Sequence, residues 1–180
     1  MNETKLAFAK ALLQLLEHET LDKITVTQIT QQANKTRQTF YRNFKDKEDL
    51  VNWYFEKLCL KSFKEMADTS TLSEALIKKF TFIKSESTFF KEAFKEDDYN
   101  SLTNYDYRCI YNFYKEKMSL NEETDFLLQM YCHGSIEMTK DWVKNNMPLD
   151  IPTFVKLLVE AMPERLKIAF NNNTKNSNKF

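Results

Sequence analysis

Residues 25–47, with the sequence TVTQITQQANKTRQTFYRNFKDK, constrain the fold more than any other stretch of the chain. Thr25 is followed three residues later by Gln28, a capping-box pair whose hydroxyl and amide satisfy the free N–H groups of a first helical turn. Apolar residues repeat at helical spacing at Val26, Ile29 and Ala33. Asn34 follows, and asparagine is one of the few residues besides glycine that accept a left-handed backbone. The pattern predicts a short helix that ends in a tight turn.

A second short helix is predicted to open at Thr36 or Arg37. Phe40 and Phe44 lie four residues apart and would share its buried face. The other faces carry guanidinium, amide and phenol groups, from Arg37, Gln38, Tyr41 and Arg42. A short helix with this surface suits the major groove of DNA, although an ordinary helical hairpin has the same periodicity.

The same residues resemble the DNA-binding domain of the TetR family of transcriptional regulators. The resemblance covers about residues 3–50. It is carried by Ile24, Thr25, Val26, Ile29, Ala33, Thr36, Arg37, Thr39, Phe40, Tyr41, Phe44, Lys47 and Leu50, and upstream by Ala7, Ala11, Leu12, Leu15 and Leu16. The chain departs from the family at Asn34, where glycine is usual, and at Lys35, where an aliphatic residue is usual. The resemblance implies a dimeric regulator, in most cases a repressor, whose variable C-terminal part binds an inducer or a partner.

The helix pattern and the resemblance together predict which residues contact double-stranded DNA. Arg37, Gln38 and Tyr41 lie on the first turns of the second helix, where helix-turn-helix proteins contact base edges. Arginine can read guanine and glutamine can read adenine through paired hydrogen bonds. The residues expected to contact phosphates are Thr27, Lys35, Thr36, Thr39, Arg42, Asn43 and Lys47. We expect the DNA partner to be a palindromic operator bound by a homodimer.

Charge is balanced over the whole chain, with 26 basic and 26 acidic residues, so it gives no overall signature of nucleic-acid binding. Between residues 34 and 47, five basic residues accompany one acidic residue, which is a local patch typical of a DNA-binding motif. One glycine and three prolines indicate an all-α fold. The three cysteines lack CxxC spacing, and no apolar run suits a membrane span or signal peptide. We therefore expect a cytoplasmic protein with reduced thiols and no membrane partner.

The helical patterns predict a three-helix DNA-binding head in residues 1–50 and a helical effector-binding and dimerisation domain in residues 67–171. A connecting helix over residues 46–66 would belong to both, and the polar residues 68–71 would mark the boundary. The later helices are expected over residues 72–94, 101–118, 121–147 and 152–170, the last kinked at Pro163. The Asn- and Lys-rich tail, residues 172–180, is expected to be disordered.

The sequence carries no motif for catalysis or cofactor binding, because it lacks a P-loop, GxGxxG, HExxH and paired cysteines. His133 and Glu137 lie four residues apart and could hold a metal on one helix face. A hydrogen-bonded or partly exposed histidine is the more common outcome for such a pair. We therefore expect no enzymatic activity, no cofactor and no metal, and an unrelated helical enzyme is only a remote alternative.

The second domain is rich in aromatic residues that could either line a pocket for a small apolar or aromatic effector or fill an ordinary core. The candidates are Phe80, Phe90, Tyr105, Tyr111, Phe113, Tyr114, Tyr131 and His133. The sequence leaves both readings open.

A stripe of apolar residues spaced four apart over residues 126–142 predicts a dimer interface built from the last two long helices. Its members are Phe126, Met130, Gly134, Met138 and Trp142, joined by Phe154, Leu158 and Met162 of the last helix. The complete prediction is a dimeric repressor released by a small-molecule effector. The alternative is a regulator, including an activator, that is controlled by a partner protein.

Overall fold

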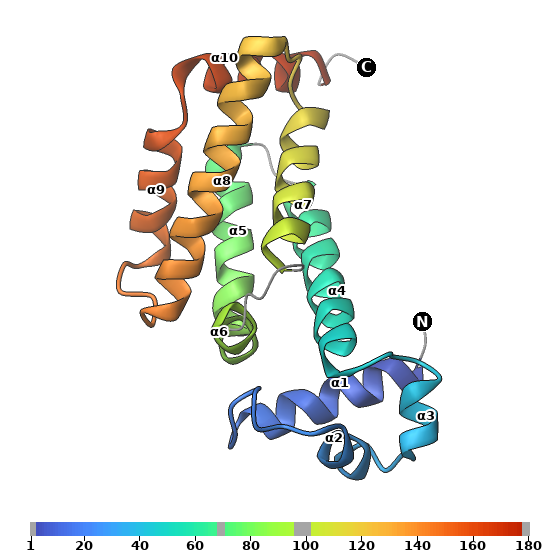
Figure 1. The fold of residues 1–180 in the computed structure, drawn as a ribbon. Coiled ribbons are helices and arrows are strands. Elements are labelled where there is room, and N and C mark those ends of the chain that lie inside the picture. Colours follow the sequence, from blue (N-terminus) through green and yellow to red (C-terminus); the bar gives the residue numbers. More distant parts are fainter. Residues whose placement is uncertain (1–2, 68–70, 96–101, 178–180) are drawn as a thin grey trace.

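The computed structural model describes residues 3–67, 71–95 and 102–177, which form ten helices and no strand. Three helices form a head at the bottom of Figure 1, and α4 rises from it into a bundle of upright helices with α10 across the top. In chain order the helices are α1 (Glu3–Leu16), α2 (Val26–Gln32), α3 (Arg37–Tyr41), α4 (Lys47–Ala67), α5 (Leu72–Ser85), α6 (Ser87–Lys95), α7 (Leu102–Glu116), α8 (Glu122–Lys144), α9 (Ile151–Ala161) and α10 (Glu164–Ser177). The predicted all-α fold is confirmed, and none of these helices has the length and apolarity needed to cross a membrane.

Local sequence signals account for the two short helices of the head. At the start of α2, the Thr25 hydroxyl accepts the N–H of Gln28, and the Gln28 side chain accepts the N–H of Thr25, as the capping-box pattern predicted. Asn34 adopts the left-handed backbone with φ at 51°. Thr36 caps α3, and its hydroxyl accepts the N–H of Thr39 at 3.1 Å.

The head is held together by aromatic packing between α1 and α3. The ring of Phe8 in α1 lies 5.2 Å from the ring of Phe40 and 6.3 Å from that of Phe44, measured between centroids. Both contacts are edge-to-face, which is a favoured geometry for aromatic pairs. Helix α3 therefore packs against α1 through the Phe8–Phe40 contact.

Helix α4 leaves the head and packs against the helices of the body. The Asp46 carboxylate accepts the N–H of Asp49 at 2.8 Å and caps the helix. Further along α4, Tyr54 and Phe55 contact Phe89 and Phe90 of α6, with ring centroids 5.0 and 5.7 Å apart. One hydrophobic core therefore runs from the head into the body. Of the boundary predicted at residues 68–71, residues 68–70 lie outside the described residues.

The helix predicted over residues 72–94 is interrupted at Glu86, so the structure has α5 and α6 instead. The hydroxyl of Ser85 donates to the carbonyl oxygen of Phe82 at 2.7 Å. A serine hydroxyl that binds its own helix competes with the backbone ladder, and Glu86 leaves helical geometry with φ −109° and ψ 25°.

The helix predicted over residues 152–170 is divided as well, at Pro163. Met162 is extended, with φ −65° and ψ 129°, because the residue before a proline disfavours helical geometry. Helix α10 then runs to Ser177, so the disorder expected from residue 172 is not what the structure shows, and residues 178–180 lie outside the described part. Buried Leu166 and Phe170 anchor the first turns of α10, and a helix already started extends at little cost.

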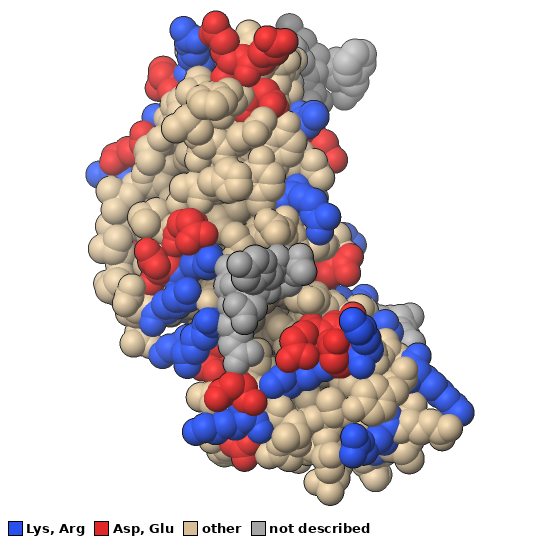
Figure 2. All heavy atoms as spheres, in the orientation of Figure 1, with Lys and Arg blue, Asp and Glu red and all other residues tan. Residues whose placement is uncertain are grey.

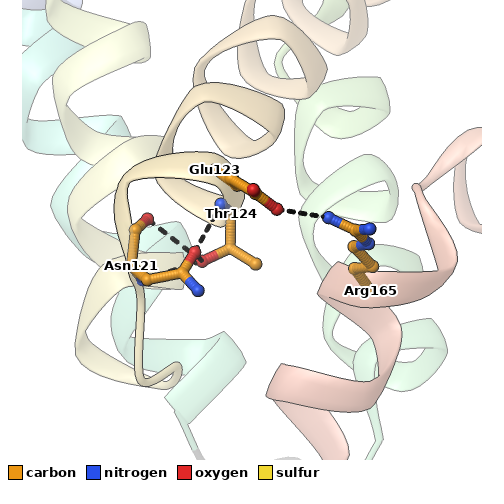
Figure 3. Close-up of polar contacts among 4 residues, drawn as sticks. All are labelled: Asn121, Glu123, Thr124 and Arg165. Carbon is orange, nitrogen blue, oxygen red and sulfur yellow. Dashed lines mark hydrogen bonds and ion pairs between the residues drawn. The ribbon is translucent and has the colours of Figure 1, made fainter.

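Helix α8 also begins at a capping box, made by Asn121 and Thr124, which Figure 3 labels. The Asn121 side chain accepts the N–H of Thr124 at 2.9 Å, and the Thr124 hydroxyl accepts the N–H of Asn121 at 2.8 Å. Beside it, Glu123 pairs with Arg165 of α10 at 2.6 Å. Both partners are well exposed, so this ion pair contributes little to stability, and the capping box fixes the start of α8.

Candidate nucleic-acid interface

The orientation of α3 is set by one buried aromatic side chain. Phe40 has no exposed surface, and its ring contacts Phe8, Phe44 and Tyr41. A helix of five residues is too short to be stable by itself, so this packing decides which way its other side chains point.

The side chains that face outward from α3 include the three predicted to read bases. Arg37, Gln38 and Tyr41 are all exposed. The guanidinium carbon of Arg37 lies 6.0 Å from the centre of the Tyr41 ring, within the range of a cation–π contact. The face therefore offers a guanidinium fork, an amide and a phenol, which together can donate to and accept from base edges.

Four of the seven predicted phosphate-contacting residues are exposed. Thr27, Lys35, Thr36 and Arg42 are exposed, whereas Thr39 and Asn43 are half-buried. The Asn43 amide donates to the carbonyl oxygen of Thr39 at 2.8 Å, which closes the end of α3. Figure 2 shows several Lys and Arg side chains over the head.

Lys47 lies in a different environment from the one expected. Its ammonium donates to the carbonyl oxygen of Leu21 at 2.6 Å and to that of Asp22 at 3.5 Å. An ammonium has three protons, so a contact with phosphate would use the third. The structure thus gives Lys47 a second task, which is to tie the start of α4 to the α1–α2 connection. Sequence reasoning missed this contact because its acceptor is a main-chain carbonyl 26 residues away.

The predicted dimer-forming residues fall into two groups. Phe126, Met130, Gly134 and Met138 are exposed on α8. Trp142 is buried inside the chain, where its ring stacks on Phe154 with centroids 4.7 Å apart, so its place in an exposed stripe was wrong. Residues spaced four apart advance by about 40° at each step around an α-helix, so the stripe has turned by about 160° between its first and last members.

The candidates on α9 and at its C-cap are buried within the chain as well. Phe154, Leu158 and Met162 are each less than one-tenth exposed. Phe154 and Met162 pack inward, whereas Leu158 also borders the surface groove described next.

An apolar groove of about 330 Å³ lies between α8 and the α9–α10 segment. Its lining is Leu127, Met130, Tyr131, Gly134, Ser135, Met138, Leu158, Ala161 and Pro163. A Cβ placed on Gly134 would meet no atom of the described residues within 4 Å, so the glycine is not required for packing inside the chain. Figure 2 shows a broad uncharged surface over α8.

Within the described residues, the eight aromatic and histidine candidates for effector binding are spread over separate pockets: Tyr131 lines one, Tyr105 another and Phe90 a third. Phe80, Phe90, Tyr114 and Tyr131 are buried, Tyr105, Tyr111 and Phe113 are half-buried, and His133 is exposed. On α7, the nine positions from Tyr105 to Tyr114 turn the helix by about 180°, which sends these side chains to opposite faces. His133 instead stacks on Tyr107 at the surface, with ring centroids 4.3 Å apart.

A buried ion pair lies between α5 and α7. The Lys79 ammonium is 3.9 Å from the Asp106 carboxylate, and burial raises the pKa of Asp106 while the charge of Lys79 opposes that shift. The adjoining cavity measures about 10 Å³, room for about one water molecule. The buried Ser62 hydroxyl also borders it. This space is far smaller than the ~300–1,000 Å³ of usual ligand pockets.

Comparison with known proteins supports the reading of both halves. Residues 9–53 match the family described as "Bacterial regulatory proteins, tetR family", and residues 70–164 match "Transcriptional regulator C-terminal region". The HTH-type dhaKLM operon transcriptional activator DhaS of Lactococcus lactis subsp. lactis (strain IL1403) is 28% identical over 94 residues, which span 52% of this chain and 50% of that protein.

Two solved structures show the same fold. The dihydroxyacetone kinase operon activator DhaS superposes with a TM-score of 0.70 at 18% identity, over 92% of this chain and 97% of that one. A TetR transcriptional regulator from Streptococcus agalactiae 2603V gives a TM-score of 0.68 at 24% identity, over 90% of this chain and 94% of that one. Both family matches and the shared helical fold therefore lead to one assignment. The chain belongs to the TetR family of transcriptional regulators, whose members bind DNA and are not enzymes.

Proposed function

We propose that the chain is a homodimeric regulator that places α3 of each subunit in the major groove of a palindromic operator. The observation that carries this proposal is the outward display of Arg37, Gln38 and Tyr41 on a short helix whose direction is fixed by buried Phe40. In helix-turn-helix proteins this position contacts base edges. Two-fold symmetry would set the two α3 helices about 34–36 Å apart, one turn of DNA.

The dimer would form through the apolar groove between α8 and the α9–α10 segment. Met130, which lines this groove, is 59% exposed, and the same two helices also expose Phe126 at 62% and Leu157 at 47%. An apolar surface of this kind marks an interaction site in a protein of ordinary composition. A two-fold axis pairs such a patch with its own copy, which removes it from water without a second complementary surface.

Control through a partner protein fits the structure better than release by a small molecule. The cavity that the described residues enclose beside Phe90 measures about 10 Å³, which is too small for a usual ligand. The sequence match and the structure match named DhaS are both described as operon activators, which favours activation over repression for this chain. A small-molecule effector is the second candidate, supported by a polar groove of about 220 Å³ between α4 and α7 that Tyr105 lines.

A screen of metabolites against operator binding separates the two kinds of control. A true effector shifts operator affinity by about 5- to 150-fold, the range of typical allosteric coupling. We expect no compound to reach that range, whereas adding protein fractions from the source cell should change operator occupancy. A metabolite that does reach it would replace the partner-protein proposal with the small-molecule one.

Replacing Gln38 with alanine is expected to relax base preference at one position of each half-site. A glutamine that reads adenine by paired hydrogen bonds supplies about 1–3 kcal/mol of discrimination against a wrong base. The measurement is selection of bound sequences from a random DNA pool by the wild type and the variant. An unchanged consensus would remove Gln38 from the reading face.

Replacing Arg42 with alanine is expected to weaken binding to all sequences by the same factor. A phosphate contact carries no sequence information, and its loss lowers the slope of log affinity against log salt by about 0.9. Salt titrations of two unrelated sequences measure this slope. Arg108→Ala, which removes the same charge from an exposed position on α7, is the control and should leave the slope unchanged. A loss confined to one sequence would show that Arg42 reads bases.

A further inference from the structure

Leu21, in the connection between α1 and α2, is held from two sides by polar contacts of its main chain. Its N–H donates to the Glu92 carboxylate of α6 at 3.1 Å. Its carbonyl oxygen accepts from the Lys47 ammonium of α4 at 2.6 Å. One peptide segment of the head is therefore fastened both to the body, through α6, and to the connecting helix, through α4.

The Glu92 contact is well protected from water. The Glu92 side chain is only 12% exposed, and its other carboxylate oxygen pairs with Lys95 one turn later. A hydrogen bond from a backbone N–H to a carboxylate is stronger than a neutral one, and shielding from solvent preserves it. Leu21 is buried too, so its N–H would have little access to water if Glu92 were absent.

Helix α6 is packed into the core, so the position of Glu92 on it is fixed. Phe89, Phe90 and Phe94 bury one face of it in the core. The residue next to Glu92 makes a second long-range link, since the Lys91 ammonium donates to the Asn146 side-chain oxygen at 2.7 Å in an exposed hydrogen bond. Asn146 lies in the α8–α9 connection, where it adopts a left-handed backbone with φ at 61°. Figure 1 shows α6 between the head and the lower end of α8.

We propose that Glu92 is a positioning residue that sets the orientation of the DNA-binding head relative to the dimer helices and thereby selects the spacing of operator half-sites. This inference rests on the proposed function. Through Lys91 and Asn146, α6 is tied to the connection between α8 and α9, and through Glu92 it is tied to the head. An operator spacing that demands a different head orientation must break one of these links.

Half-site spacing is the readout that a merely stabilising contact would not move. Each base pair inserted at the operator centre shifts a half-site by about 3.4 Å and rotates it by about a tenth of a turn. A fastened head cannot follow this change, so affinity falls. A head without this contact can reorient to match the moved half-site, and it loses part of its affinity for the best spacing. Loss of stability alone would instead lower the active fraction equally for every spacing.

The test compares wild type, Glu92→Gln and Glu92→Leu on one selected operator and on versions with one and two base pairs inserted at its centre. Glutamine keeps an acceptor oxygen and leucine does not, while both remove the same charge. We expect wild type and Glu92→Gln to prefer the original spacing, and Glu92→Leu to lose about tenfold of that preference, the usual effect of losing one buried hydrogen-bond partner.

The same experiment on Lys91→Met tests the other end of the link without touching Leu21, and it decides the matter if Glu92→Leu melts before it can be assayed. Because the Lys91–Asn146 hydrogen bond is exposed, its loss should flatten the spacing profile in the same direction but by less than Glu92→Leu does. Profiles of unchanged shape, or an equal loss at every spacing, would overturn the positioning role of Glu92. If wild type selects no operator at all, the proposed DNA-binding function itself is overturned, which is a distinct result.

Discussion

Replacing Met130 with glutamate is expected to convert the proposed dimer to a folded monomer and to weaken operator binding by roughly 10²- to 10⁴-fold, the gain that linking two binding modules usually supplies. Met130 is 59% exposed and borders the apolar groove, so the substitution leaves the core of the chain untouched. In a symmetric interface it buries two carboxylates, and each unpaired buried charge costs several kcal/mol.

Sedimentation of the variant measures its mass, and circular dichroism checks that it is folded. Leu60→Glu is the matched control, because Leu60 is 57% exposed on α4, away from α8 and α9. It should remain a dimer with full operator affinity. A Met130→Glu dimer with unchanged DNA binding would mean that another surface joins the subunits.

Replacing Phe40 with alanine is expected to unfold the head and abolish operator binding. Deleting a fully buried phenylalanine costs about 3–5 kcal/mol, a large share of the ~5–15 kcal/mol that holds a typical domain together. The lost stability mainly affects α3, because this helix has only five residues and depends on the Phe40 ring for its orientation. Hydrogen exchange of the α1–α3 amides measures the local unfolding, and DNA binding is measured on the same sample.

Phe40→Leu is the graded control, because leucine keeps most of the buried volume. It should lower stability less and keep measurable operator binding. If Phe40→Ala bound the operator with full affinity and its head amides stayed protected, then α3 would not owe its orientation to this side chain.

The head could be predicted from sequence because its signals are local. The Thr25–Gln28 capping box, the left-handed Asn34 and the Phe40–Phe44 pair each act within a few residues, and the structure contains all three. The contact between Lys47 and the Leu21 carbonyl had no such signal. A main-chain acceptor can belong to any residue, so only the fold reveals it.

The body was harder to predict because its helices pack on several sides. A spacing of four residues suggested one stripe on α8, yet a helix turns every 3.6 residues, so Trp142 ended in the core against Phe80. The many aromatic residues fitted a pocket and a core equally well. Only packing decides between these, and it places Phe80 and Phe90 in the core.

Helix breaks in the body followed chemistry that the sequence shows only weakly. Pro163 was expected to kink a helix, and it ended α9 outright because Met162 had to become extended. The break at Glu86 depends on a serine hydroxyl that bonds back to its own helix, and most serines in helices do not interrupt them.

The central claim is that two copies of the chain present α3 to a palindromic site on DNA. The most direct test is to incubate the purified protein with fragments of its own genome and sequence the DNA that it retains. We predict an enriched palindrome whose half-site centres lie about one helical turn apart, bound by two chains per site. Retained fragments with no shared motif, or a motif without two-fold symmetry bound by one chain, would contradict the account.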